Sequence, residues 1–530
     1  FMKKQLLALS ICLTLTASAN PAEACTTLLI TPGASADHSM YVTHSNDAGL
    51  SDPSIVYVPA KNHPAGSRRP VYPSAIAWDE LPSHNCFNTP RLVDPERAPG
   101  YAYQNEKPTI PLGWIPEVEH TYAYIDTDYG VMNEHGLMFG ECTNNSRSYS
   151  MPADPGTGLF YSSELSRVAL ERCRTAREAV TLIGNLIDTY GLYGTGETLL
   201  IADRTEGWIL EMQPVPGGPG GLWIAKRVPD GTFFAAANQF RIRDIEMDNP
   251  DLLFNPELPQ RLEKLGWAVH DPATGKLDWL RSMNGTEDFH PYFSLRRIWR
   301  AMSLLAPSQN LPARVKDSFT RDYPFSIKPD KPITLAGLMA LHRDCYEGTE
   351  FDLTKGDAAG LFGSPYRYGP ANWNRPIGYR ISSYARIMQA KEGQSNPVAW
   401  IALAIQREST YVPLAVAPMP AGYEQVDRRR YDPSKPWWTY MQTAEFVQGR
   451  VSVLEGDVHQ AALAAEKDAA ALVNANRNLP PDEFAARLRE NALRTEASWK
   501  ELYGRLLVEH NQGKETRYTQ DLPGDDVNHY

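Results

Sequence analysis

Short apolar runs recur along the chain and are separated by turn residues such as Gly, Pro, Asn and Asp. Runs of this length between turn signals predict β-strands. Residues 203–206 and 229–231 are turn residues between consecutive runs, so the strands on either side of each are expected to form antiparallel pairs. The predicted strands cover 27–31, 40–43, 54–58, 122–125, 137–141, 198–202, 207–212, 222–227, 232–237, 379–389 and 398–404.

Three regions show helical spacing of apolar residues instead. Residues 159–190 carry two apolar stripes with a break near Arg174, and 296–305 carry another. The Ala-, Glu- and Arg-rich region from 437 to 509 predicts further helices, interrupted at Pro480-Pro481. Strands followed by a helical pair and then by more strands predict an α+β protein with helices layered on antiparallel sheet. Residues 436–530 are expected to form a helical C-terminal extension.

Composition and charge narrow the functional class. The chain has 530 residues, of which 42% are hydrophobic and 22% charged, as in ordinary globular proteins. Its net charge of −11 argues against a nucleic-acid partner. The basic run Arg428-Arg429-Arg430 is interpreted as a solvated surface feature.

The N-terminus has the pattern of a secretory signal peptide. Met2-Lys3-Lys4 is basic, Leu6 to Ala19 is apolar, and Ala22-Glu23-Ala24 forms a small-x-small cleavage site before Cys25. The apolar run is too short to span a bilayer comfortably, and no later apolar run is long enough. We therefore expect residues 1–24 to be removed and the protein to be exported to the periplasm or outside the cell, with no stable membrane insertion.

Removal of this segment would leave Cys25 with a free α-amine. A thiol attacks an amide carbonyl once a base has taken its proton, and the α-amine of the same residue can serve as that base. The alternative is lipid attachment to Cys25, although Ala22 and Glu23 fit a lipoprotein site poorly. Cys25, Cys86, Cys142, Cys173 and Cys345 would remain, an odd number that leaves at least one thiol unpaired and the bridges of the others open.

No other catalytic motif competes with Cys25. The sequence has no G-x-S-x-G elbow, no H-E-x-x-H, no paired CxxC and no phosphate-binding loop. No metal ion and no organic cofactor are implied.

Several motifs, in order from Cys25 to about Pro413, resemble the dipeptidase A family of cysteine peptidases. This family lies within the N-terminal-nucleophile hydrolases and is related more distantly to penicillin acylases and bile-salt hydrolases. The motifs are Cys25-Thr26-Thr27-Leu28-Leu29, Met132 to Leu137 with Gly140-Glu141, Leu200-Ile201-Ala202-Asp203, Trp208-Ile209-Leu210-Glu211, Trp223 to Gly231, Ala237-Asn238-Gln239-Phe240 and Tyr346 to Thr354.

The resemblance implies a four-layer αββα N-terminal-nucleophile hydrolase domain over residues 25–435. It also implies that Cys25 is the nucleophile and forms an acyl-enzyme that water hydrolyses. An Arg-x-x-Asp pattern usually follows in the family, and here that position reads His44-Ser45-Asn46-Asp47. Asp47 keeps the carboxylate that would orient the α-amine, whereas His44 replaces a permanently charged arginine.

By the same resemblance, Asn238 is an oxyanion donor. A second substrate-binding donor falls at Thr143, which is in register with the acylase asparagine, or at Asn144, which has the familiar side chain. Arg297 matches an arginine that stabilises the acylase site, with Arg296 and Arg300 as neighbouring alternatives.

The sequence thus predicts an exported cysteine dipeptidase that takes small peptides as substrates. An acylase-like hydrolase of N-acyl amides is the alternative with the same mechanism. A lipid-anchored binding protein that uses Cys25 only for attachment is the alternative from another class. Side-chain preference and oligomeric state stay open, and a homo-oligomer is compatible with the sequence.

Overall fold

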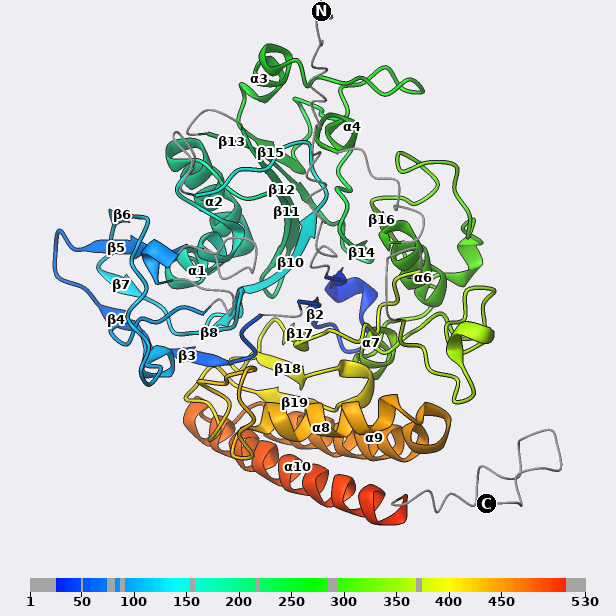
Figure 1. The fold of residues 1–530 in the computed structure, drawn as a ribbon. Helices are drawn as coiled ribbons and strands as arrows, with labels where there is room; N and C mark the ends of the chain where they lie inside the picture. The colour runs from blue at the N-terminus through cyan, green and yellow to red at the C-terminus, as the bar shows by residue number, and fades with distance from the viewer. Residues whose placement is uncertain are drawn as a thin grey trace, which may run out of the picture.

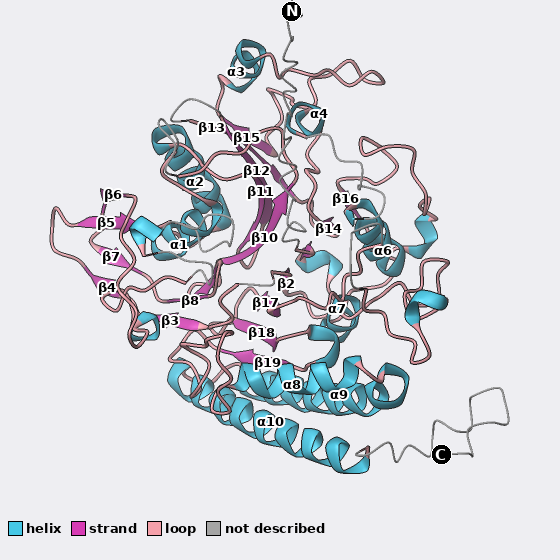
Figure 2. Cartoon of the chain, viewed as in Figure 1, coloured by secondary structure: helices cyan, strands magenta, loops and turns pink. Residues whose placement is uncertain are grey.

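A computed structural model describes residues 25–48, 51–73, 82–85, 91–152, 158–215, 220–284, 293–367 and 374–510. The predicted signal peptide, Cys86 and residues 511–530 lie outside these ranges. Two large antiparallel sheets and several helices make up the described chain (Figures 1 and 2). The α+β class predicted from the sequence is therefore confirmed.

The first sheet has seven strands, and the N-terminal strand β1 lies near its centre. Every residue of β1 is buried, and β1 pairs antiparallel with β14 on one side and β2 on the other. In spatial order the strands are β16 (Ser326–Ile327), β14 (Phe233–Ala236), β1 (Thr27–Ile30), β2 (Met40–Asn46), β17 (Tyr384–Ala390), β18 (Val398–Leu403) and β19 (Tyr411–Leu414).

The second sheet has eight strands, and its long central members run from β10 to β13. In spatial order they are β15 (Leu252–Phe254), β13 (Gly221–Arg227), β12 (Gly207–Pro214), β11 (Gly196–Ala202), β10 (Met138–Asn144), β9 (Gly130–Asn133), β8 (Tyr124–Asp126) and β3 (Val56–Val58). Two small ribbons occupy a region where the sequence analysis predicted no strands of this length. They pair β4 (Lys61–Asn62) with β7 (His120–Thr121) and β5 (Arg68–Val71) with β6 (Gly113–Pro116).

The two sheets face each other across a shared apolar core. Successive side chains of a strand point to opposite faces, so Leu29 enters this core while Leu28 and Ile30 enter a second core on the outer face. The two sheets approach closely at Gly140, where an added Cβ would lie 2.6 Å from Thr27 Oγ1. Only glycine fits this contact, which brings β10 next to the beginning of β1.

Helices cover the outer face of each sheet. Helices α1 (Ser162–Arg172) and α2 (Ala176–Tyr190) pack on the eight-stranded sheet and confirm the helical pair predicted from the sequence, with a capping box at Thr175 opening α2. The outer face of the seven-stranded sheet contacts α6 (Leu295–Leu305) and α7 (Leu335–His342). Two smaller helices, α3 (Leu258–Leu265) and α4 (Trp279–Met283), share another apolar cluster.

The C-terminal helices lie against β18 and β19 (Figure 1). They are α8 (Pro436–Gln448), α9 (Val451–Asn476) and α10 (Pro481–Glu509), and the break before α10 falls at the predicted Pro480-Pro481. Trp437 and Trp499 join the same apolar cluster as Leu29. No helix within the described ranges has an apolar stretch long enough to cross a bilayer.

One predicted strand pair is wrong. Strands β13 and β14 flank the turn at 229–231, but β13 pairs with β12 and β15 in the eight-stranded sheet while β14 pairs with β1 and β16 in the other. The turn therefore carries the chain from one sheet to the other. The predicted pair β11 and β12 is confirmed, with Ala202 opposite Gly207.

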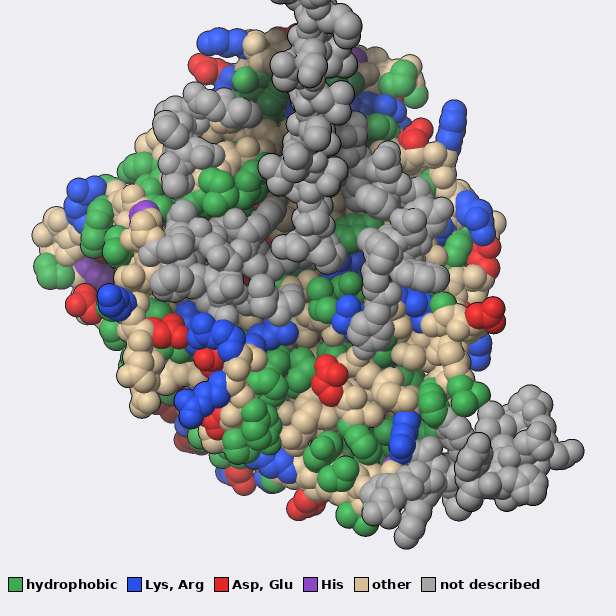
Figure 3. All heavy atoms as spheres, in the orientation of Figure 1, with side chains coloured by type: hydrophobic (Ala, Val, Ile, Leu, Met, Phe, Trp, Pro, Cys, Tyr) green, Lys and Arg blue, Asp and Glu red, His purple; other side chains and the backbone are tan. Residues whose placement is uncertain are grey.

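On the face shown in Figure 3, Lys and Arg side chains are interspersed with Asp and Glu.

Candidate active site

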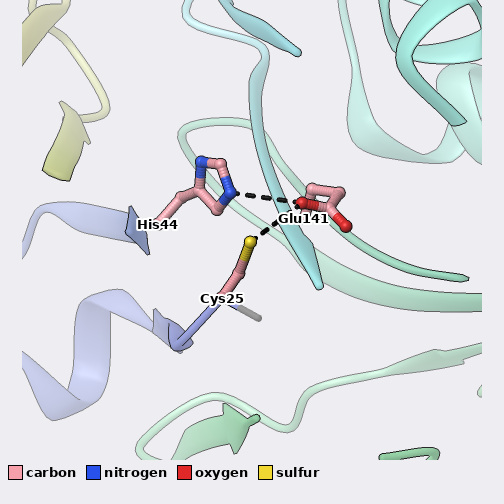
Figure 4. A group of neighbouring side chains, drawn as sticks. All are labelled: Cys25, His44 and Glu141. Carbon is pink, nitrogen blue, oxygen red and sulfur yellow. Dashed lines mark hydrogen bonds and ion pairs between the residues drawn. The ribbon is translucent and has the colours of Figure 1, made fainter. Parts of the chain in front are cut away.

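Cys25 lies two residues before β1 and is 3% exposed. Its thiol Sγ–H donates to Glu141 Oε2 on β10 across a distance of 3.4 Å (Figure 4). Burial raises the pKa of the Cys25 thiol well above its usual range, the Glu141 and Asp47 carboxylates raise it further, and the backbone N–H of Asp47 acts in the opposite direction. The resting side chain is therefore a neutral thiol that needs a base before it can attack.

The four described cysteines, Cys25, Cys142, Cys173 and Cys345, are all buried and form no disulfide among themselves. Cys142 belongs to the surroundings of Cys25, because its Sγ lies 3.8 Å from the Cys25 carbonyl oxygen and accepts from the Asn238 backbone N–H at 2.7 Å.

His44 lies on β2, and its Nε2 points at the Glu141 carboxylate, which also accepts from the Cys25 thiol. The distance from Nε2 to Glu141 Oε2 is 3.2 Å, and the ring is fully buried. Burial and the nearby Arg386 guanidinium lower the pKa of His44 to about 4, so the imidazole is neutral at neutral pH. His44 thus joins Cys25 at the Glu141 carboxylate, but as a neutral ring it supplies no positive charge there.

Arg386 supplies a buried cation here, and the sequence analysis missed it. It stands opposite His44 in the β2–β17 register and lies fully buried. Its guanidinium donates to Thr127 Oγ1 at 2.7 Å and to the carbonyls of Tyr129 and Gly130 at 3.0 and 3.1 Å. All of these acceptors are neutral, and the Arg386 charge also interacts with the Glu141 and Asp126 carboxylates and with Cys25.

Glu141 belongs to one of the motifs that carry the resemblance, and the structure places it at the centre of the cluster. Burial opposes its ionisation, but hydrogen bonds with His44 and Glu197 outweigh burial and lower the pKa of Glu141. Glu197, on β11, has its pKa raised well above the usual range by burial and by the Glu141 charge. The pair therefore holds one negative charge, on Glu141, and one proton, on Glu197.

Asp47 follows β2 and is fully buried. Its carboxylate accepts from Arg375 Nη2 at 3.2 Å and from the Ser382 hydroxyl. Burial raises the pKa of Asp47, although both partners act to lower it. Arg375 and Ser382 thus hold the side chain in one orientation beside Cys25.

Arg297, from α6, joins the backbone of Cys25 to Asn238. Its Nη1 donates to the Cys25 carbonyl oxygen at 2.9 Å and to Thr26 Oγ1 at 3.0 Å, and its Nη2 donates to Asn238 Oδ1 at 2.6 Å. Burial and the Arg375 charge lower its pKa to about 10, so Arg297 stays charged at neutral pH. Arg296 and Arg300 point elsewhere, toward Asn374 and Asp344 respectively.

Asn238 lies just after β14 in the left-handed region, with φ +62°. With Oδ1 held by Arg297, its Nδ2 donates to the Thr143 carbonyl oxygen at 2.5 Å. A carboxamide has two N–H donors, so one remains for a developing oxyanion.

The structure distinguishes the two alternative donors on β10. Thr143 belongs to the cluster, because its Oγ1 donates to Glu141 Oε1 at 2.9 Å. The Asn144 side chain donates instead to Thr198 Oγ1 on β11 at 2.7 Å, away from the Cys25 contacts.

Glu211, on β12, holds the backbone that follows Asn238. Its buried carboxylate accepts from the backbone N–H of Arg241 at 2.6 Å and of Ile242 at 3.2 Å. Burial raises the pKa of Glu211 from 4.5 to about 7, and the two N–H donors act to lower it. Between these values the native state binds more protons than the unfolded state.

This shift predicts a pH-dependent stability. The native Glu211 pKa is the higher one, so the contribution of this group is most favourable below pH 4.5 and is lost as pH rises through about 7, by about 3 kcal/mol in all. Glu211→Gln, which cannot ionise, should gain stability relative to wild type between pH 5 and pH 8 in thermal unfolding. The exposed Glu263→Gln serves as the control, and an equal Tm difference at both pH values for Glu211→Gln would contradict the assignment.

The site of this α+β protein therefore combines a buried cysteine with a carboxylate, an imidazole, an arginine and a carboxamide. The family model described as "Peptidase family C69" matches residues 106–464, which is 359 of the 530 residues. The chain therefore belongs to peptidase family C69, and it is a peptidase. The matched range contains Glu141, Asn238 and Arg297, whereas Cys25, His44 and Asp47 precede it.

Curated relatives are similar over much of their length. A "Probable dipeptidase" of Salmonella dublin is 25% identical over 410 residues, which cover 74% of this chain and 80% of that protein. A "Probable dipeptidase B" of Lactococcus lactis subsp. lactis is 25% identical over 297 residues, covering 53% of this chain and 56% of that protein. A "Dipeptidase" of Bifidobacterium longum is 25% identical over 378 residues, covering 64% and 67%.

Proposed function

We propose that this protein is an exported cysteine dipeptidase that hydrolyses dipeptides or short peptides through an acyl-enzyme on Cys25. The names of its relatives support the substrate class. Two facing sheets with helices outside each support the four-layer αββα fold of N-terminal-nucleophile hydrolases. The signal-like N-terminus supports export and the release of the Cys25 α-amine.

One observation carries this proposal. Residues that the resemblance marks as functional, up to 272 positions apart in the chain, meet around Cys25. Arg297 contacts the Cys25 carbonyl, Asn238 contacts Arg297, and the backbone of Asp47 lies at the Cys25 sulfur. A cysteine that served only packing would not need this set of buried polar groups, each of which costs free energy to desolvate.

In the proposed reaction the α-amine takes the thiol proton as Sγ attacks the scissile carbonyl carbon. The carbonyl oxygen becomes an oxyanion, for which the free Asn238 N–H is the donor, with Arg297 fixing the carboxamide. The C–N bond then breaks, and the α-ammonium returns the proton to the leaving amine. Water, deprotonated by the same amine, hydrolyses the thioester, and this releases the acid and restores the thiol.

Asp47 is the orienting carboxylate in this scheme. Asp47→Asn keeps the shape and the contact with Ser382 but removes the charge, so we expect kcat to fall by about 10²-fold with little change in KM. Steady-state hydrolysis of a dipeptide measures both constants, and Ser382→Ala, which removes only one partner of Asp47, should have the smaller effect. Unchanged kcat in Asp47→Asn would remove Asp47 from the mechanism.

Two measurements test the function as a whole. Mass spectrometry of the protein recovered from the exporting cell should show a chain that begins with an unmodified Cys25; a lipid on Cys25 would refute the mechanism. Substrate profiling should show hydrolysis of dipeptides. Turnover of N-acyl amides without turnover of dipeptides would replace the proposed substrate class by acyl amides.

A further inference from the structure

We propose that Cys25, His44 and Glu141 form a binding site for a thiophilic divalent cation such as Zn²⁺, and that the bound ion inhibits the enzyme. The inhibition rests on the proposed function, because it requires Cys25 to be the nucleophile. The binding itself rests only on the geometry of three buried side chains: His44 on β2, Glu141 on β10 and Cys25, two residues before β1 (Figure 4).

The ligand atoms have the spacing of a metal site. Cys25 Sγ lies 3.4 Å and His44 Nε2 3.2 Å from Glu141 Oε2, and all three atoms lie within 4.8 Å of one another. Zn²⁺ binds sulfur at about 2.3 Å and nitrogen or oxygen at about 2.0–2.2 Å, so neighbouring ligands of a tetrahedral site are about 3.3–3.6 Å apart. Small side-chain movements would therefore complete three corners of the tetrahedron.

The ligand types also match. Thiolate, imidazole and carboxylate are the three protein ligands of zinc, and a thiolate selects against Mg²⁺ and Ca²⁺. Cys25 and Glu141 together would neutralise a doubly charged ion. The α-amine of a chain that begins at Cys25 would lie one five-membered chelate ring from Sγ and could provide the fourth ligand.

The surroundings favour a dissociable ion over a structural one. Thr143 Oγ1 holds the other oxygen of Glu141, Oε1, and so orients Oε2 toward the cluster. The His44 Nδ1, in contrast, has no hydrogen-bond partner among the described residues, and the Arg386 charge lies nearby. Tight zinc sites usually fix the second ring nitrogen of each histidine. We therefore expect the affinity for the ion to be lower than that of a structural zinc site. A lower affinity allows the ion to dissociate when its free concentration falls, so the inhibition is reversible.

A second cluster of possible metal ligands provides the control for the binding test. Glu408, Glu455 and His459 also lie within ligand distance of one another, but the cluster contains no sulfur. His459 Nε2 is paired with the Arg407 carbonyl oxygen, and the Arg407 guanidinium is bound to Glu455. A cation already occupies this cluster in the form of arginine, so His459→Ala should leave metal binding unchanged.

The test uses Co²⁺ as a spectroscopic probe and Zn²⁺ as the inhibitor. The purified protein should develop a thiolate-to-Co²⁺ charge-transfer band, absent in Cys25→Ala. His44→Ala and the better-filling His44→Asn should bind Co²⁺ at least ~10-fold more weakly, whereas His459→Ala should bind as wild type does. Circular dichroism identifies a variant that fails to fold. Zn²⁺ should abolish peptide hydrolysis, and a chelator should restore it.

The outcomes separate the two proposals. An active wild-type enzyme that shows no Co²⁺–thiolate band would overturn the metal site and leave the dipeptidase function intact. Wild-type affinity in both His44 variants would also overturn it, because the third ligand would then be unnecessary. Full activity in Cys25→Ala would refute the proposed function, and with it the inhibition, while the absorption band still reports on binding.

Discussion

Replacing Cys25 by alanine is expected to reduce peptide hydrolysis by at least about 10⁴-fold, because no other described side chain occupies the attacking position. Losing the nucleophile of a covalent mechanism removes the chemical step and leaves only binding and oxyanion stabilisation. The fold should survive, since the change deletes only one sulfur atom. Single-turnover hydrolysis of a dipeptide by Cys25→Ala measures the loss.

The matched control is Cys173→Ala, which removes another buried cysteine at the C-terminal end of α1, in the core on the outer face of the eight-stranded sheet. It should retain activity and should retain labelling of one thiol by a substrate-like alkylating agent. Cys25→Ser tests sulfur chemistry with nearly unchanged volume and should also be severely impaired. Substantial activity in Cys25→Ala would assign the hydrolysis to a different nucleophile.

The second large effect is expected at Asn238. Removing one oxyanion donor costs about 10²–10³ in kcat. Asn238→Gly deletes the carboxamide without backbone strain, because glycine adopts φ +62° readily, whereas Asn238→Ala would combine two effects. Measured kcat for Asn238→Gly should therefore fall by this factor, with the larger part of the change in kcat and not in KM.

Asn310→Gly provides the control for the substitution itself. Asn310 is exposed and also has a positive φ, of 47°, and it ends the 3-10 helix Pro307–Gln309 that follows α6. It should have wild-type kinetics. If Asn238→Gly retained wild-type kcat as well, Asn238 would not be the oxyanion donor, and the Asp47 backbone N–H, which hydrogen-bonds to the Cys25 sulfur, would be the next group to test.

Much of the secondary structure follows from local pattern. Strands such as β1, β11 and β12 and helices α1, α2 and α6 fall where apolar spacing predicts them, because their buried faces impose a period on the sequence. The strands of the small ribbons β4–β7 and β5–β6 were not predicted from the apolar pattern. Strands of two to four residues have too few buried positions to show a period. The turn at 229–231 was predicted as a hairpin for a related reason: a turn looks the same whether the next strand pairs with the last one or leaves the sheet.

Some residues of the candidate site can be predicted from the sequence, and others are revealed only by the structure. Cys25, His44 and Asp47 lie within one short stretch, and their pattern is visible in the sequence. Arg386 is adjacent to His44 only because β17 pairs with β2 in a register that places these two residues opposite each other. Nothing in the sequence of either strand predicts this register. The place of Glu197 in the site is likewise not visible in the sequence, because its effect on the pKa of Glu141 depends on the pairing of β11 with β10.

The sequence alone therefore determined most of the longer strands and helices and the cysteine about which the site is built, because these depend on residue type and short-range spacing. Only the tertiary structure decided which arginine of α6 faces Cys25, that Thr143 and not Asn144 joins the cluster, and that Arg386 places a charge beside His44. The physical reason is that charge–charge interaction and hydrogen bonding depend on distance in space. Sheet pairing brings together atoms that the chain separates by hundreds of residues.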